Sequence, residues 1–350
     1  VLGRKIEPVF RVLDATASGD PFPSFCAAFS QDEKVFAVLS PWNSNAAFHA
    51  CLAKAGTLYI TDALTQEDEE TFTEFKPYLV SGFMTSSRAA VTLARSLCHT
   101  SGYFTASTRL GVIRPNNPTG ERVYKKHFVP TLASECNVTP IDDTFSALTS
   151  RAGVDAAQRF AGKNIDRVAF VTSQGGPPLG FMVAAQSQSY FPRYGLASPD
   201  SPLFLAQNAP YTQLRGTVGA GWAPGLDVFD SEGPPYSPAE KRCFDVHTKS
   251  GTTYSARGGG DVGAFVALTF CDMMWLFEEA GIKAGKTLNV GSFASALATL
   301  GTSHQTTITF GTTFAPGVYD GANQYRPLAY DDSPSCRCFR YSGPAQSVPR

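Results

Sequence analysis

The chain has 350 residues, of which 29 are basic and 30 acidic, so its formal net charge at pH 7 is -1. This balance excludes a protein that binds nucleic acid or an anionic membrane through a strong positive field, because both need clustered cationic side chains. With 31 glycines, 24 prolines and only 17% charged residues, the composition also excludes a coiled coil, a helical bundle and a disordered chain.

The first hundred residues alternate short apolar runs with segments of helical period, which is typical of βαβ units. The apolar runs predict strands at Ile6–Leu13, Val35–Ser40, Leu58–Thr61 and Tyr78–Gly82. The helical segments carry their apolar side chains on one stripe, and they lie at Pro21–Gln31, Ser44–Ala55 and Thr85–Cys98. A stretch rich in Thr and Ser at 105–108 then indicates a crossover to a second domain.

The same alternation restarts after this crossover. Strands are predicted at Leu110–Arg114, Val138–Phe145, Arg167–Thr172 and Thr217–Trp222. Helices are predicted at Gly120–Cys136, Gly153–Gly162 and Leu179–Tyr190, whereas Pro202–Gln207 fits either class. The Pro- and Gly-rich residues 223–238 have the composition of a linker, which places a second crossover near Trp222.

Two strong helical patterns follow the linker, and a short one succeeds them. These predict helices at Pro238–Ser250, at Asp261–Ala280 with its end at Gly281, and at Val290–Leu300. The last strands are predicted at Thr306–Phe310, Tyr325–Tyr330 and Cys338–Tyr341. All apolar runs are far shorter than the roughly 20 residues of a membrane span.

The eight cysteines bear on the redox compartment. Cys26 and Cys51 lie in successive predicted helices, as do Cys243 and Cys271, and each pair would close a loop of a length at which a disulfide stabilises well. Four buried free thiols are the alternative. Cys336 and Cys338 lack the spacing of a zinc or redox motif, and we expect at least one of them to be bonded to Cys98 or Cys136.

Catalytic and metal-binding motifs are missing from the sequence. The five histidines show no metal-ligand spacing among themselves or with cysteine, so no metal and no cofactor is expected. The Gly-rich stretches lack the Lys-Ser/Thr pair of a phosphate-binding loop, and no Gly-x-Ser-x-Gly motif occurs. Adjacent carboxylates such as Asp142 and Asp143 point to opposite faces of an extended chain. A noncatalytic binding cleft is therefore predicted.

Several stretches together resemble one protein family. They are Gly3–Glu7 with the extended run after it, Val35–Pro41, Gly56–Thr61, Leu110–Ile113 before Thr119–Gly120, and Ala264–Gly281. This order resembles the type I periplasmic solute-binding proteins of the branched-chain amino-acid ABC transporter class, and the resemblance covers nearly the whole chain. It implies an α/β fold of two Rossmann-like lobes with parallel central sheets, joined by three hinge crossovers. Lobe 1 would comprise 1–106 with 223–316, and lobe 2 would comprise 107–222 with 317–350.

The start of the chain departs from the family pattern. The first strand and helix of the family would precede Val1. We therefore expect the chain to lack the leader and the first βα unit, which would leave the sheet of lobe 1 with an unpaired edge.

Ligands of α/β sheets bind beyond the carboxyl ends of the strands, which selects the loops after each predicted strand. In the first lobe these loops carry Trp42 as an apolar wall and Asn43 and Ser44 at the start of a helix, and the resemblance adds Ala63 and Thr65. Simple helix capping is the alternative role of Asn43, Ser44 and Thr65. In the second lobe the corresponding residues are Asn117, Thr119, Gln174 and Asn208.

The second lobe also departs from the amino-acid binders of the family. Those proteins usually present aromatic residues where Thr119 stands and near Gly176, and a carboxylate near Asn208 for the ligand ammonium. This chain has a neutral Gln207–Asn208 pair there. A buried ammonium without a counter-charge is costly, so an α-amino acid is a doubtful ligand and a neutral or anionic organic solute is expected.

The function implied by the resemblance is that of an extracytoplasmic solute-binding protein. It would be a monomer that binds a small molecule by hinge closure and delivers it to a membrane ABC permease. It would be periplasmic or extracellular, and a leader missing from this chain could supply a lipid anchor. A ligand-sensing receptor or regulator domain on the same fold is the alternative, followed by an α/β enzyme.

Overall fold

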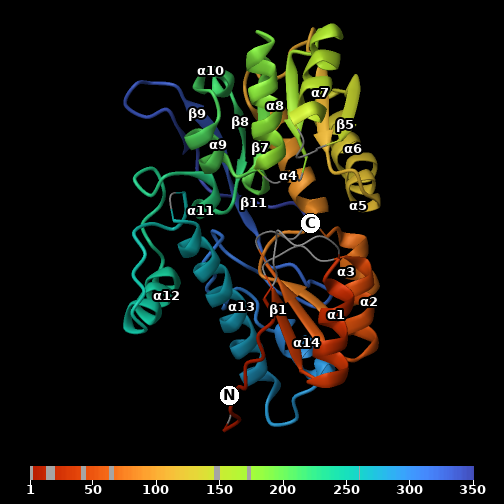
Figure 1. Cartoon of the computed structure of the whole chain (residues 1–350), viewed down its shortest axis with the longest axis vertical. Helices are drawn as coiled ribbons and strands as arrows, with labels where there is room; N and C mark the ends of the chain where they lie inside the picture. Colours follow the sequence, from red (N-terminus) through yellow and green to blue (C-terminus); the bar gives the residue numbers. More distant parts are fainter. Residues whose placement is uncertain are drawn as a thin grey trace.

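The computed structural model describes residues 3–12, 20–40, 45–62, 67–145, 150–171, 175–259 and 261–350. Two lobes are stacked along the long axis of the molecule, and each is built on a sheet flanked by helices (Figure 1). This arrangement confirms the α/β class and the two-lobed architecture. Within these ranges, no helix is both long and apolar enough to cross a membrane.

Lobe 1, at the bottom of Figure 1, has a parallel sheet of order β1-β2-β3 among the described residues. Its strands are β1 (Ala37–Ser40), β2 (Leu58–Thr61) and β3 (Leu79–Ser81). Its helices are α1 (Phe22–Ala27), continued by the π-helical turn η1 (Ala28–Asp32), α2 (Ala46–Lys54), α3 (Glu69–Phe75), α13 (Val262–Ala284) and α14 (Val290–Leu297). Leu58 and Ile60 pack against α13 and α14, whereas Tyr59 between them packs against α1, α2 and α3. Successive side chains of a strand point to opposite faces of the sheet, so both faces are buried.

Lobe 2 has a larger sheet of order β10-β9-β8-β7-β6-β4-β5, with β11 paired to β9. The strands β4 to β8 are parallel, and β9 and β10 are antiparallel additions. Their bounds are β4 (Leu110–Arg114), β5 (Asp142–Phe145), β6 (Arg167–Phe170), β7 (Arg193–Ala197), β8 (Val218–Gly221), β9 (Gln324–Asp331), β10 (Cys338–Tyr341) and β11 (Gln346–Ser347).

The helices of lobe 2 cover both faces of this sheet. Leu110 and Val112 of β4 face α4 and the helical segment of residues 118–136, and Ile113 faces α7 and α8. The helices are α4 (Ser86–His99), α5 (Pro118–Arg122) with η2 (Val123–Phe128) and α6 (Val129–Cys136), α7 (Ser150–Gly162), α8 (Gly176–Ser187), the 3-10 turn η3 (Ser198–Asp200), α9 (Pro202–Asn208), α10 (Tyr211–Leu214) and α11 (Pro224–Asp227). The remaining helix, α12 (Pro238–Lys249), packs on α13.

The chain first passes between the lobes earlier than expected. The predicted boundary at residue 106 assigns α4 to lobe 1, but Leu93 and Leu97 of α4 belong to the core beneath the second sheet. The passage therefore lies at Gly82–Thr85 and not at 105–108. The returning chain runs alongside it, because Gly321 N donates to Ser81 O (2.9 Å) and Ala322 N to Phe83 O (3.1 Å).

Two predicted strands are absent from the described residues. Residues 6–12 of the predicted strand Ile6–Leu13 pair with no strand that the structure describes, and Phe10 and Val12 are exposed. Pro8 in their middle lacks the N–H that a ladder needs. Thr306–Phe310 is irregular because the amides of Thr307, Ile308 and Thr309 donate to the side chains of Asp272 and Thr306 instead of to a strand.

One helix prediction is also corrected. The long helix continues through the predicted stop at Gly281, which is buried, and ends at Ala284 before Gly285, whose φ of 79° suits glycine. The helix α3 and the strand β7 are additional elements. The strand is short and contains Gly195, where a side chain would lie 2.8 Å from Leu97.

The disulfides pair all eight cysteines. Cys26 is bonded to Cys51 and Cys243 to Cys271, as expected. The expected bond from Cys336 or Cys338 to Cys98 or Cys136 is not formed, since Cys98 is bonded to Cys136 and Cys336 to Cys338. Packing of α4 along α6 brings the first of these pairs together.

Candidate functional site

The carboxyl ends of the strands in both sheets meet at the waist between the lobes. β3 ends directly before the first passage to lobe 2, and β8 ends shortly before the chain returns to lobe 1. Because the other strands of β1–β3 and β4–β8 run parallel to these two, their carboxyl ends lie along the same two edges. Such edges are where open α/β sheets bind ligands, so the waist is the candidate site.

Most of the predicted ligand-binding residues lie outside the described residues. These are Trp42, Asn43, Ser44, Ala63, Thr65 and Gln174. Their roles remain predictions from the sequence.

Asn117 and Thr119 are placed at the start of α5, on the waist edge of lobe 2. The Oδ1 atom of Asn117 accepts a hydrogen bond from Gly120 N (2.7 Å), which makes Asn117 the N-cap of α5. The Thr119 hydroxyl accepts a hydrogen bond from Arg122 Nη2 (3.3 Å). Both residues therefore have structural roles at the edge where a ligand contact is predicted.

Asn208 does not directly follow a strand. It is the last residue of α9, exposed, and its Nδ2 donates to Phe204 O (2.8 Å). The loop that directly follows β7 is Ser198–Ser201, and it contains Asp200, a fully buried residue whose carboxylate accepts from Ala197 N (2.8 Å). The sequence prediction missed Asp200 because it missed β7, although the turn-forming Ser-Pro-Asp at 198–200 marks the end of a strand. The neutral pair Gln207–Asn208 thus does not lie in the loop that directly follows β7, and the ligand class expected from it stays a prediction.

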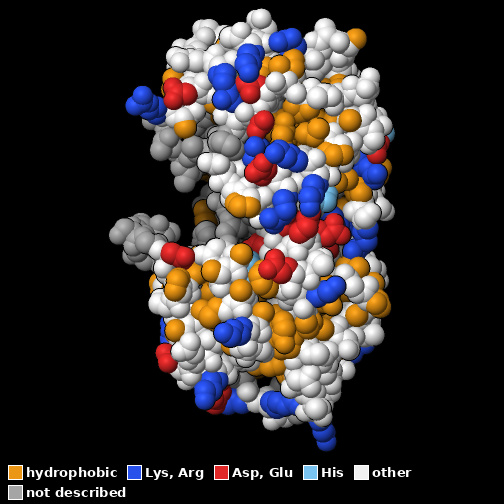
Figure 2. Space-filling view, turned by 90° about the vertical axis from the view of Figure 1, so that its right-hand side faces the viewer, with side chains coloured by type: hydrophobic (Ala, Val, Ile, Leu, Met, Phe, Trp, Pro, Cys, Tyr) orange, Lys and Arg blue, Asp and Glu red, His pale blue; other side chains and the backbone are white. Residues whose placement is uncertain are grey.

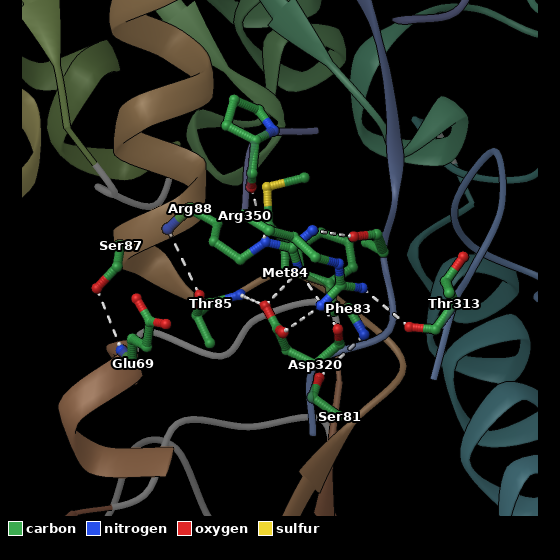
Figure 3. A network of polar contacts seen from close by, with 12 residues as sticks. Glu69, Ser81, Phe83, Met84, Thr85, Ser87, Arg88, Thr313, Asp320 and Arg350 are labelled. Carbon is green, nitrogen blue, oxygen red and sulfur yellow. Dashed lines mark hydrogen bonds and ion pairs between the residues drawn. The ribbon is translucent and has the colours of Figure 1, made fainter. Parts of the chain in front are cut away.

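A buried ion pair at the waist joins the start of α4, just after the first passage, to the returning chain at Asp320 (Figure 3). Arg88, in the first turn of α4, places Nη1 2.5 Å from Oδ2 of Asp320, and both side chains are less than a tenth exposed. Arg88 also donates to Ala322 O (2.7 Å) and Pro349 O (3.1 Å), and Thr85 N donates to Asp320 (3.1 Å). This network fixes the start of α4 to the returning chain.

A pocket of about 340 Å³ opens beside this network. It is lined by one face of α3, by Lys76, by the start of α4, by residues 317–320 and by Arg350. The guanidinium of Arg350 donates to Thr313 O (2.9 Å) and lies 3.9 Å from Asp320. Burial and the neighbouring Arg88 lower the pKa of Arg350.

Ion pairs also cross the waist between α3 and the α5–η2 segment. Both oxygens of Asp68 accept from Arg122, at 2.7 and 3.0 Å. Glu70 lies 3.0 Å from Lys126 and 3.7 Å from His127. Burial by itself would raise the pKa of Asp68, but hydrogen bonds from Arg122 and Thr71 outweigh it and hold that pKa below its usual value.

Asp227 is a fully buried carboxyl group next to the second passage. It accepts hydrogen bonds from Ala223 N (3.0 Å) and from the hydroxyl of Tyr341 (2.8 Å). Burial raises its pKa to about 7, although these donors and Ser198 oppose the shift. Ionisation of Asp227 therefore destabilises the folded state.

Replacing Asp227 with Asn should remove a pH-dependent loss of stability. The raised pKa means that the contribution of this group is most favourable below pH 4, falls as the pH rises toward 7, and is constant above that. The variant is neutral throughout, so its stability relative to the parent should rise by roughly 2–3 kcal/mol between pH 5 and pH 8. Urea unfolding at the two pH values measures this, and an equal difference at both would contradict the assignment.

His304 lies between two carboxylates beneath the first passage. Its Nδ1 is 2.9 Å from Glu279 and its Nε2 is 3.5 Å from Asp272, both on α13. Burial would lower the pKa of His304, but the two carboxylates outweigh burial and raise it to about 9. A side chain at Gly82 would collide with the Asp272 carboxylate, which explains why glycine stands there.

Two groups of potential metal ligands occur in the part of the chain that the structure describes. Cys243, His247 and Cys271 form one, and Glu232, Cys336 and Cys338 form the other. Cys243 and His247 lie one turn apart on α12, and Cys271 joins them from α13. In both groups the sulfurs are held in disulfides, so the thiolates that bind metals are not present.

Comparison with known proteins gives a likeness of fold alone. No family model matches the sequence, and no curated protein matches it. One similar structure is a solute-binding protein of an ABC transporter from Rhodopseudomonas palustris HaA2 in complex with p-hydroxybenzoic acid, with a TM-score of 0.70, 14% identity, and coverage of 96% of this chain and 85% of that one. Another, from Rhodopseudomonas palustris BisB5 with 3,4-dihydroxybenzoic acid, has a TM-score of 0.67 and 12% identity over 94% and 83% of the two chains.

An amino-acid transporter protein is equally similar. The branched-chain amino-acid ABC transporter protein from Thermus thermophilus with bound valine has a TM-score of 0.67 and 14% identity over 93% of this chain and 81% of that one. The chain therefore has the two-lobed fold of these solute-binding proteins.

Proposed function

We propose that the chain is an extracytoplasmic solute-binding protein of an ABC-type importer, which encloses one small organic solute at the waist. One observation carries this proposal. The parallel strands of the two sheets have their carboxyl ends at facing edges, and the chain passes between the lobes there at Gly82–Thr85 and, alongside, at Gly321–Ala322. Ligands bind at such edges, and adjoining passages allow hinge closure. Similar structures with solutes bound support the same reading.

The solute is proposed to carry a carboxylate. The ligands named for the similar proteins are hydroxylated benzoic acids and valine, which share that group. An α-amino acid adds an ammonium, and Asp200 supplies a buried carboxylate beside the waist edge of β7. Both acid classes are therefore candidates: the benzoates are among the anionic solutes expected from the sequence, and the amino acids are added to them.

The export and partner assignments belong to the same proposal. Four disulfides fit an oxidising compartment, which agrees with a periplasmic or extracellular location. The partners would be the solute and a membrane permease, with the chain acting as a monomer and without catalysis.

Thermal unfolding with a solute panel tests the function. At a hundredfold excess over its Kd, a bound solute stabilises the folded state by about 2.7 kcal/mol, which raises the midpoint. We expect this from at least one of 4-hydroxybenzoate, 3,4-dihydroxybenzoate, leucine, isoleucine and valine. Stabilisation by sugars or polyamines and by no carboxylic acid would contradict the proposed solute class.

Replacing Asp200 with Asn separates the two acid classes. If the solute is an amino acid, its ammonium loses the buried counter-charge and the affinity should fall about a hundredfold or more. Benzoate binding should change little. Titration calorimetry measures both, with Asp155→Asn on the exposed surface of α7 as the matched control. Equal loss for both classes would show that Asp200 supports the loop and does not contact the ammonium.

A further inference from the structure

Opposite charges face each other where α3 of lobe 1 meets the α5–η2 segment of lobe 2. The α3 side presents Asp68, Glu69 and Glu70, and the opposite side presents Arg122 and Lys126. Figure 2 shows acidic side chains directly below basic ones at this point of the waist. Three ion pairs cross the boundary here, and the two charged faces belong to different lobes.

The pair of Asp68 and Arg122 has the geometry of a strong interaction. It is bidentate, at 2.7 and 3.0 Å, and the Asp68 side chain is fully buried while Arg122 is one third exposed. Paired planar groups of this kind add directional specificity to the charge attraction. Partial burial also protects the pair from the screening that weakens exposed ion pairs.

The cap that Asp68 forms on α3 does not depend on its ion pair with Arg122. Asp68 is the N-cap of α3, and its Oδ1 accepts from Thr71 N (3.0 Å) and from the Thr71 hydroxyl (2.5 Å). Arg122, by contrast, keeps only the Thr119 hydroxyl of its own lobe as a partner among the contacts described. Separation of the lobes would break the interlobe bonds and leave the cap intact, which is the behaviour of a reversible contact.

We propose that Asp68 with Arg122, reinforced by Glu70 with Lys126 and His127, is an electrostatic latch that holds the lobes closed before a solute enters. Its effect on solute affinity rests on the proposed function, but the closed state itself does not. Close charge pairs at interfaces have coupling energies that correspond to at least a tenfold change in an equilibrium constant. Removal of Arg122 should therefore shift the closed-to-open ratio by about tenfold or more.

The distance between the lobes tests the latch in the absence of solute. Spin labels at Lys54→Cys on α2 and Gln158→Cys on α7 lie on exposed sites of the two lobes. In low salt the parent should show mainly the short distance, and Arg122→Gln should show mainly a longer one. The control is Arg95→Gln, because Arg95 pairs with Glu135 inside lobe 2, and it should match the parent.

Two results would overturn the latch. One is the same distance in the parent and in Arg122→Gln, and the other is a parent that is already open in low salt. Should the variant fold poorly, Asp68→Asn gives an independent measurement, because Asn can still cap α3 but removes the charge that faces Arg122, and it should lengthen the distance. The distances are measured without solute, so they do not depend on whether any solute of the panel binds. The latch and the proposed function can therefore be disproved independently of each other.

Discussion

Replacing Arg88 with Met should lower the free energy of unfolding by about 3–5 kcal/mol. The substitution leaves the Asp320 carboxylate buried without its counter-charge and takes donors from Ala322 O and Pro349 O. The loss is large because a buried charge without a partner costs more than the pair contributes. Urea unfolding followed by circular dichroism measures it.

The double variant Arg88→Met with Asp320→Asn is the matched control. It removes the buried charge as well, so it should recover a substantial part of the lost stability, although Thr85 N then donates to an amide oxygen instead of a carboxylate. The free energy of unfolding of Arg88→Met alone could instead lie within about 1 kcal/mol of that of the parent. The pair would then behave like an exposed ion pair, which would contradict its burial.

Stability should also fall by about 3 kcal/mol between pH 6.5 and pH 10 through His304. The folded-state pKa of about 9 exceeds the usual 6.5, so the protonated ring stabilises the fold fully below pH 6.5. That contribution is lost as the pH rises through 9, because the neutral ring no longer balances Asp272 and Glu279.

The variant His304→Gln isolates this effect. It cannot be protonated, so it should be less stable than the parent at pH 6.5, and the gap should close toward pH 10. Urea unfolding at four pH values from 6.5 to 10 gives the comparison. A gap that stays constant over this range would mean that His304 is not charged in the folded protein.

The sequence predicted those parts of the fold that local pattern determines. β2, β4 and β10 have the predicted bounds, because each is a short apolar or β-branched run closed off by turn residues. The helix α13 was equally clear from its buried stripe, although its end was misplaced at Gly281. An internal glycine buried against a neighbouring element resembles a C-cap when only the sequence is seen.

Features that depend on distant contacts were not predictable. Arg88 and Asp320 are separated by 232 residues, and Asp68 and Arg122 by 54. In the sequence alone, these four side chains are therefore indistinguishable from ordinary surface charges. The bond of Cys98 to Cys136 depends on α4 crossing to lobe 2, which a boundary at residue 106 conceals. The strand β7 was also missed, so the sequence placed a ligand-contacting loop at Asn208, whereas the loop that directly follows β7 carries Asp200.

Hinge closure on a solute is tested most directly by the interlobe distance between labels at Lys54→Cys and Gln158→Cys in the Arg122→Gln background. Without solute this variant should be mainly open. Titration with the panel of benzoates and amino acids should convert it to the short distance, saturating at one solute per chain. A distance that stays long with every member of the panel, including any that binds by calorimetry, would contradict closure of the two lobes around a carboxylate-bearing solute.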